Sequence, residues 1–444
     1  EYLTSETDPD WQKEAKNHIN NLEQLLNEQN NQNIEEQLIV EIEKENSEKI
    51  KYIVTQNPHL ARIFVLEKLI PQWAALVNIE KDKAIKLIKG GKIIGEIILN
   101  LQQDKGVIDI IEFIIKTSEV SEKEALLAQA HLTYAEGEIA LNKYENSKAK
   151  ELFEKAIKLF AQIQDENYKS WSLFQIARCE IVLSEYQKSL SLLKLVIKFS
   201  QEKTHLYLLA RSWWVTGLIQ DYQSNFSYSL NSKQLAINYL EQISDNEGIA
   251  VVNMLVAETL VNLKNFDGLG VYQHKALSNI IKVKNSKWTF NIIWGIGKEL
   301  FRVGELEASS YFYKELQSLA NKENNQTYRF SSLLENAQLQ QKLGNVALAN
   351  SYLAIAYQEL EKIPDLTYQL SSKQLFLITQ AQFNVETQPQ IALNKLVKLE
   401  EILPKDDPIY KTAILRLQAK AYLALKEYDQ AETALTESIK LFEN

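Results

Sequence analysis

Cysteine and proline are scarce in this chain, and each scarcity excludes a class of structure. Cys179 is the one cysteine among 444 residues, which excludes an internal disulfide framework and any zinc site built on two or more thiolates. The seven prolines leave the long stretch between Pro71 and Pro364 without any. A loop-rich β protein would need prolines in its turns and edge strands, so the sequence favours an all-α fold.

Long apolar runs and a strong charge on the body of the chain are also missing. No apolar run approaches the ~20 residues that cross a bilayer, so we expect no membrane partner. The net charge of −9 is local, because residues 1–50 contain 13 acidic and 4 basic side chains while the remainder contains 45 of each. A neutral body binds phosphate backbones poorly, so we expect no nucleic-acid partner. The lysine-rich, asparagine-rich composition suggests a bacterial protein, and we expect a cytoplasmic location.

Patterns typical of catalysis or metal binding are absent as well. The five histidines lie far apart and form no HExxH motif. Cys179 lies in an apolar helical stretch, where a buried thiol is expected rather than a nucleophile. The glycine–lysine segments at 90–92 and 295–298 lack the Ser or Thr of a phosphate loop. We therefore expect no catalytic residue, no metal, no cofactor and no enzyme activity.

A small or short residue recurs every 40 residues along the middle of the chain. Its positions are Ala149, Ser189, Ser229, Leu269, Ser309 and Ala349, and Ala392 and Ala431 continue the series after 43 and 39 residues. A second small residue stands twelve residues upstream of each of the first six, at Gly137, Ala177, Gly217, Ala257, Gly297 and Ala337. Two small positions per unit allow two helices to cross closely, and a period of this length is typical of a helical-repeat solenoid.

Each unit is predicted to be a helical hairpin. The third unit illustrates it, with helices near 208–221 and 227–240 and a polar turn at 223–225. About eight such hairpins fill residues 123–444. Residues 1–122 are predicted to form a helical N-terminal extension that is outside the register and acidic in 1–50.

The extension is predicted to contain several helices. The first begins at Asp8 and Pro9, which fit an N-cap and a first helical position, and ends near Leu26. Others are expected near 34–56, 60–78, 81–103 and 107–116, with Pro71 kinking or breaking one of them.

The third hairpin resembles the tetratricopeptide repeat (TPR). Trp213, Gly217, Ser229 and Ala236 match positions 4, 8, 20 and 27 of that repeat. The resemblance implies a right-handed solenoid, although the unit here has 40 residues rather than 34.

A second resemblance concerns residues 2–280. Several segments are similar to the helical-repeat region of bacterial proteins that end in a CHAT domain, a caspase-like protease domain. These segments are 2–3, 8–11, 14–15, 57–58, 66–67, 69–74, 177–179 and 210–218. The resemblance implies a TPR-like region that works with such a protease. In that family the protease follows the repeats, and here the sequence ends after the eighth unit, so no His–Cys dyad is carried over.

The TPR resemblance also implies which residues face the inner groove. The first helix of each unit lines that groove, chiefly through positions 5 and 9. The predicted partner-binding residues are Tyr134, Glu138, Phe174, Arg178, Arg211, Trp214, Tyr222, Trp294, Lys298 and Arg302. An aromatic row beside alternating charges suits an extended peptide or a partner helix. The alternative is that position 5 packs between adjacent units.

Together these features predict a non-catalytic scaffold that binds a protein or peptide and regulates a CHAT protease, fused to it or separate. The alternative is a peptide-sensing regulator whose superhelix changes shape when a ligand binds.

Overall fold

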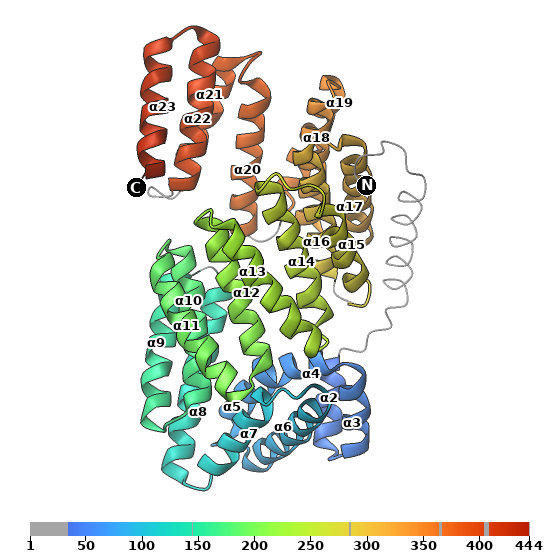
Figure 1. The fold of residues 1–444 in the computed structure, drawn as a ribbon, viewed down its shortest axis with the longest axis vertical. Coiled ribbons are helices and arrows are strands. Elements are labelled where there is room, and N and C mark those ends of the chain that lie inside the picture. The colour runs from blue at the N-terminus through green and yellow to red at the C-terminus, as the bar shows by residue number, and fades with distance from the viewer. Residues whose placement is uncertain (1–33, 144, 284–285, 364–365, 404–407, 444) are drawn as a thin grey trace. The chain divides into compact units, whose positions relative to one another are not determined.

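The described residues are helical throughout. The computed structural model describes residues 34–143, 145–283, 286–363, 366–403 and 408–443, and these contain helices and turns but no strand (Figure 1). This confirms the all-α prediction. The helix expected between Asp8 and Leu26 lies outside the described residues. Among the helices described, none is both long and apolar enough to cross a membrane.

The chain divides into two compact units, Glu1–Trp288 and Thr289–Asn444. The first unit begins with the extension helices α2 (Ile34–Glu43), α3 (Ser47–Gln56), α4 (Pro58–Phe64), the π-helix η1 (Val65–Leu69), α5 (Ile70–Leu76), α6 (Lys81–Gln102) and α7 (Gly106–Thr117). Its hairpins follow as α8 (Ser121–Asn142), α9 (Asn146–Gln162), α10 (Glu166–Val182), α11 (Tyr186–Lys203), α12 (Leu206–Tyr222), α13 (Phe226–Gln242), α14 (Asn246–Asn262) and α15 (Leu269–Ile280). The extension therefore shares a unit with the first hairpins of the array.

The second unit continues the array of hairpins. Its helices are α16 (Ser286–Val303), which begins just before the unit boundary, α17 (Leu306–Lys322), α18 (Gln326–Lys342), α19 (Val346–Leu360), α20 (Leu366–Asn384), α21 (Pro389–Glu400), α22 (Pro408–Leu425) and α23 (Tyr428–Glu443). Consecutive helices pair as the 40-residue period predicts, and the third hairpin, α12 with α13, begins and ends within two residues of its predicted bounds.

The turns between helices recur with a period of 20 residues. A residue in the left-handed region ends successive helices at Gln164, Ser184, Thr204, Ser224, Ser244, Lys264, Gly304, Asn324 and Gly344. After Ser224, for example, the N–H of Asn225 donates back to the carbonyl of Gln220 at 2.7 Å, which satisfies a free carbonyl at the helix end. Each 40-residue hairpin is thus two helix–turn modules of equal length.

The extension differs from its prediction in two places. The helix expected over 34–56 is wrong as a single element, because the chain turns at Glu45 (φ 56°) and Asn46 caps a new helix by accepting from the N–H of Lys49 at 3.2 Å. The helix around Pro71 is not broken. A π-helical turn at Val65–Leu69 precedes it, and such a turn widens the backbone where a proline ring would crowd the carbonyl four residues earlier.

The two small positions of each hairpin do lie at a close helix crossing. Ser189 and Ser309 are fully buried, and their hydroxyls donate to the carbonyls of Ala177 at 2.7 Å and Gly297 at 2.9 Å. A Cβ placed on Gly217 would stand 2.8 Å from Cγ of Lys233 and 3.3 Å from the carbonyl oxygen of Ser229. The predicted register is therefore confirmed in three dimensions.

Enlarging the small residue should force the hairpin open. We expect Gly217→Leu to lower the free energy of unfolding by about 1–3 kcal/mol, because the new side chain must displace Lys233 and the backbone of α13. Ala161→Leu is the matched control, since Ala161 is exposed on α9. Denaturant unfolding of both variants measures the effect. Equal stability of Gly217→Leu and the control would show that the crossing tolerates bulk.

A neutral histidine lies in the core of the first unit. The ring of His131 on α8 packs edge-on against Trp73 of the extension, Phe160 and Tyr168, with the Tyr168 centroid 4.3 Å away. Within the described part of the chain neither ring nitrogen has a hydrogen-bond partner. Burial lowers the pKa of His131 from 6.5 to about 3, because the charged form would lose its solvation without gaining a partner.

Acid should therefore destabilise this core. Between pH 6.5 and about 3 the unfolded chain binds a proton at His131 that the folded chain excludes, so stability falls as the pH falls through that window and is complete above it. We expect His131→Phe to flatten this dependence by an amount on the order of 4 kcal/mol between the two limits. Comparing unfolding of the two proteins at each pH cancels the titration of other groups. Parallel curves would contradict the neutral histidine.

Candidate functional site

The predicted groove residues lie in two separate sets. Those of the first unit are on α8, α10 and α12, and those of the second unit are on α16. In the first set Tyr134, Phe174 and Trp214 are buried, whereas Glu138, Arg178 and Arg211 keep a partly exposed edge. Tyr222 is 59% exposed and stacks on Tyr186 at the far end of α12, away from the others. In the second set Trp294 is partly exposed, and Lys298 and Arg302 are exposed.

In both units, the residue at position 5 of the tetratricopeptide numbering makes a side-chain hydrogen bond to the next hairpin. The amide of Gln175 donates to the hydroxyl of Tyr134 at 3.2 Å, and the indole N–H of Trp294 donates to Glu335 at 2.8 Å. Each pair is separated by 41 residues, so position 5 of one hairpin contacts position 6 of the following one. The geometry at these two positions agrees with the alternative in which the residue at position 5 packs between adjacent hairpins. Whether the same residues also bind a partner stays a prediction.

Four charged groups gather on the inner face of the first unit. Glu138 lies against Arg178 and Arg211, and Glu67 on η1 brings a second carboxylate to the same place. Burial raises the pKa of Glu138 and of Glu67, and the two arginines act in the opposite direction. Burial also lowers the pKa of Arg178, to which the Arg211 charge contributes. The charges of the two glutamates and the two arginines therefore cancel where the extension packs against the array.

A buried ion pair anchors the extension to the third hairpin. Arg62 on α4 and Asp104 after α6 are each 1% exposed, with Nε and Oδ2 3.1 Å apart. The other oxygen of Asp104 accepts from the backbone N–H of Leu206 at 2.9 Å and of Gly106 at 3.1 Å. The Arg62 guanidinium also lies 5.2 Å from the ring centroid of Tyr207.

Other polar contacts join the extension to two turns of the array. At the turn before α12, the N–H of Lys105 donates to the carbonyl of Thr204 at 3.0 Å, and His205 lies 2.9 Å from Asp109. At the turn before α14, Gln102 donates to the carbonyl of Ile243, and His59 lies 3.4 Å from Asp245. The inner face of the first unit is therefore covered in part by the chain's own helices.

The second unit presents a different inner face. Lys298 lies over the Trp294 ring, 5.9 Å from its centroid, and Glu335 completes this group on α18. Burial raises the pKa of Glu335, while the Trp294 bond and the Lys298 charge oppose that rise. Farther along, Gln338 donates to Thr379 on α20 at 3.1 Å. These side chains form a partly exposed row of mixed aromatic, amide and charged groups.

The geometry of the described residues bears on metal binding and on the reactivity of the thiol. No cluster of three or more His, Cys, Asp or Glu side chains with suitable geometry occurs among them. Cys179 is fully buried, and burial raises the pKa of its thiol to about 11, so the thiolate that a nucleophile requires is scarce at neutral pH.

Several residues of this site were missed by sequence reasoning. Arg62, Asp104 and Glu67 lie outside the repeat register, so periodicity could not find them. Gln175 and Glu335 had a signal, since both are polar residues at position 6, directly after the predicted aromatic row.

Comparison with known proteins supports the fold. No protein-family model and no curated protein matches the chain. The apo form of the quorum sensor NprR from B. thuringiensis is similar over 86% of this chain and 99% of its own, with 11% identity and a TM-score of 0.53. Aspartyl phosphate phosphatase F from Bacillus subtilis is similar over 85% and 94%, with 16% identity and a TM-score of 0.50. The chain is a TPR-like helical-repeat protein.

The Arg62–Asp104 pair offers a test of how the extension is held. We expect Asp104→Asn to lower the free energy of unfolding by about 3 kcal/mol, because it leaves the Arg62 charge buried without its counter-ion. Hydrogen exchange should also speed up at the N–H groups of Lys105 and Leu206. Glu145→Gln is the control, since it removes a fully exposed pair with Lys148 that solvent screens. If Asp104→Asn lowered the free energy of unfolding no more than Glu145→Gln does, the pair would not anchor the extension.

Proposed function

We propose that this chain is a non-catalytic scaffold that binds a protein or peptide through the inner face of its second unit. One observation carries the proposal. The inner face of the first unit is covered in part by the extension, whereas Trp294, Lys298 and Gln338 of the second unit remain accessible. An aromatic ring flanked by an ammonium group and a side-chain amide is suited to an extended peptide, because it supplies apolar area and hydrogen bonds together.

The fold of NprR supports a sensing role for the same surface. NprR is a quorum sensor, and by analogy this chain would respond to a peptide by changing the packing between hairpins. The lateral bonds between Trp294 and Glu335 and between Gln338 and Thr379 are the contacts that a bound peptide would compete with. This peptide-sensing function is the first candidate, and we place it in the cytoplasm.

Regulation of a caspase-like CHAT protease is the second candidate. It rests on the sequence resemblance of residues 2–280 alone. Under this proposal the scaffold itself cleaves nothing, and a separate or fused protease supplies the His–Cys pair.

A paired measurement on Trp294 tests the binding surface. A partner is first captured on the immobilised chain and identified by mass spectrometry, and is then titrated against the variants. We expect Trp294→Ala to weaken binding about thirtyfold, the loss of about 2 kcal/mol typical of an aromatic anchor. Trp294→Phe keeps the ring but loses the bond to Glu335, so it separates inter-repeat packing from partner contact.

Two further variants distinguish the outcomes. Lys298→Glu reverses an exposed charge and should weaken binding of an acidic partner. Trp214→Ala should lower the melting temperature more than Trp294→Ala, because Trp214 is only 8% exposed. If Trp294→Ala melts early and Lys298→Glu binds normally, Trp294 belongs to the inter-repeat core and the proposed surface is wrong.

A further inference from the structure

One interval of the 40-residue register is lengthened to 43 residues in the second unit, between Ala349 and Ala392. α21 begins 23 residues after α20, whereas α19 begins 20 residues after α18. The additional residues lengthen α20 and the turn that follows it. α20 packs less closely on α19 than α18 does on α17 or α14 on α13.

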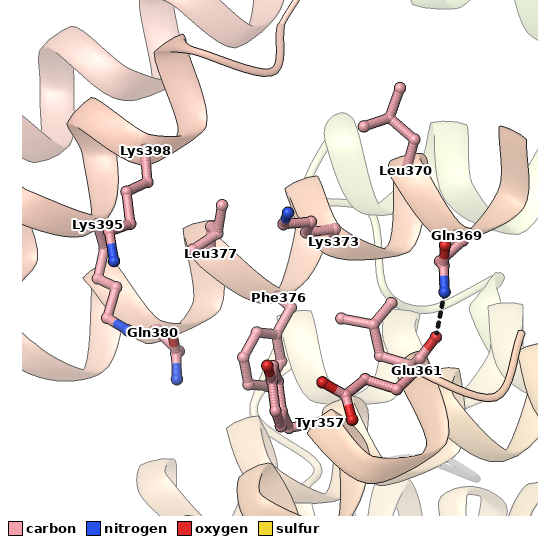
Figure 2. A pocket seen from close by; sticks show the side chains of 11 residues that line it. Tyr357, Glu361, Gln369, Leu370, Lys373, Phe376, Leu377, Gln380, Lys395 and Lys398 are labelled. Atoms are coloured by element: carbon pink, nitrogen blue, oxygen red, sulfur yellow. Dashed lines mark hydrogen bonds between the residues drawn. The ribbon is translucent and has the colours of Figure 1, made fainter. Parts of the chain in front are cut away.

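A cleft of about 800 Å³ lies at this junction, between the end of α19, the outer side of α20 and α21 (Figure 2). Its size is within the range of small-ligand and peptide sites. None of the predicted groove residues lines it. The cleft is therefore a surface that neither the repeat pattern nor the proposed inner face accounts for.

Three lysines give the cleft its charge. Lys373 extends from α20, and Lys395 and Lys398 extend from α21 on the facing wall (Figure 2). Among the described residues no carboxylate pairs with any of the three. Glu361 is the one acidic residue lining the cleft. Three lysines against one glutamate give the lining of the cleft a net positive charge, which favours an anionic ligand.

The floor of the cleft is apolar and aromatic. Tyr357 and Phe376 have ring centroids 5.6 Å apart, and Leu377 lies beside them. Phe376 is buried, but Tyr357 beside it is 49% exposed (Figure 2). An apolar group of a ligand would find a ready contact surface here.

Side-chain amides extend the cleft along α19. A neighbouring pocket shares Tyr357, Phe376 and Gln380 with the cleft, and Asn350 and Asn384 line it as well. The amide oxygen of Gln380 is buried and has no hydrogen-bond partner among the described residues. An amide both donates and accepts, so a row of amides matches the alternating N–H and C=O groups of an extended peptide backbone.

We propose that this cleft binds an acidic peptide segment that carries an apolar side chain. The lysines bind its carboxylates, Tyr357 and Phe376 contact the apolar side chain, and the amide of Gln380 bonds to its backbone. The site uses none of the inner-face residues, so it stands or falls independently of the proposed function.

Calorimetric titration of the full chain tests the proposal. The probe is the blocked, unlabelled peptide Asp-Glu-Phe-Asp-Glu, with Asn-Gln-Phe-Asn-Gln as its neutral twin. We expect only the acidic peptide to bind, and to bind more weakly in high salt because partly exposed charges are screened. The double variant Lys395→Gln/Lys398→Gln should weaken binding about tenfold, as expected for two solvent-facing ion pairs.

Single variants test whether charge determines the affinity for the peptide and whether the peptide lies in the cleft. Glu361→Gln removes the one acid of the cleft and should tighten binding, an effect that loss of folding cannot imitate. Tyr357→Ala should weaken it, since the exposed ring is removed with little loss of core. Lys420→Gln, at an exposed lysine on α22, should change nothing.

Each contrary result overturns the proposal in a different way. Equal binding of the neutral peptide would show that charge is not recognised. Loss of binding in Trp294→Ala but not in the lysine variant would place the peptide on the inner face. Benzoate or inorganic phosphate binding as tightly as the peptide would show a small-anion site instead.

Discussion

The structure depends on one steric constraint, the close crossing of two helices at a pair of small residues. In the fifth hairpin this crossing joins Gly297 to Ser309, whose hydroxyl donates to the glycine carbonyl at 2.9 Å. The serine hydroxyl can reach that carbonyl only if the residue twelve positions upstream, which carries the carbonyl, has a small side chain or none. The two positions therefore constrain each other. The crossing fixes how the first helix of a hairpin lies against the second. Equivalent lateral bonds then recur within each unit, as between Gln175 and Tyr134 and between Trp294 and Glu335.

The array could be predicted because its signal is repeated, whereas its boundaries depended on weaker signals. Small residues at a fixed interval identified the hairpins and their helices to within two residues at α12 and α13. The turns were harder to recognise, since seven of the nine left-handed turn positions named above hold a residue other than glycine, such as Gln164, Ser184 or Thr204. The break at Glu45 was missed for the same reason. A left-handed non-glycine residue is imposed by the packing of the helices on either side, which a single sequence does not display.

The candidate site could be predicted only in part, because its residues come from two sources. Those on the repeat helices follow the period, so Trp294 and Arg178 could be named from the register. Those of the extension do not repeat, and their contacts cross long separations, as between Asp104 and the backbone of Leu206. Sequence alone therefore suggested a continuous groove, whereas the first unit uses part of that face to hold the extension. The buried Arg62–Asp104 pair helps to fix how the extension packs on the array, because a misaligned arrangement would leave two buried charges without their partners.

The cleft beside α20 shows how an interruption of a repeat can produce a site that regular packing would eliminate. In a regular junction the second helix of one hairpin closes on the first helix of the next, and the apolar side chains between them leave no room. The longer α20 and its turn shift the following helices relative to the regular repeat. Phe376 belongs to the hydrophobic core shared with α19, whereas Leu377 belongs to the core shared with α21 and α22. The space between these two cores opens to solvent, and the lysines of α20 and α21 face it (Figure 2). The interval of 43 residues between Ala349 and Ala392 was visible in the sequence as a departure from the period. In a solenoid such departures are informative, because every regular interval is already accounted for by helix packing.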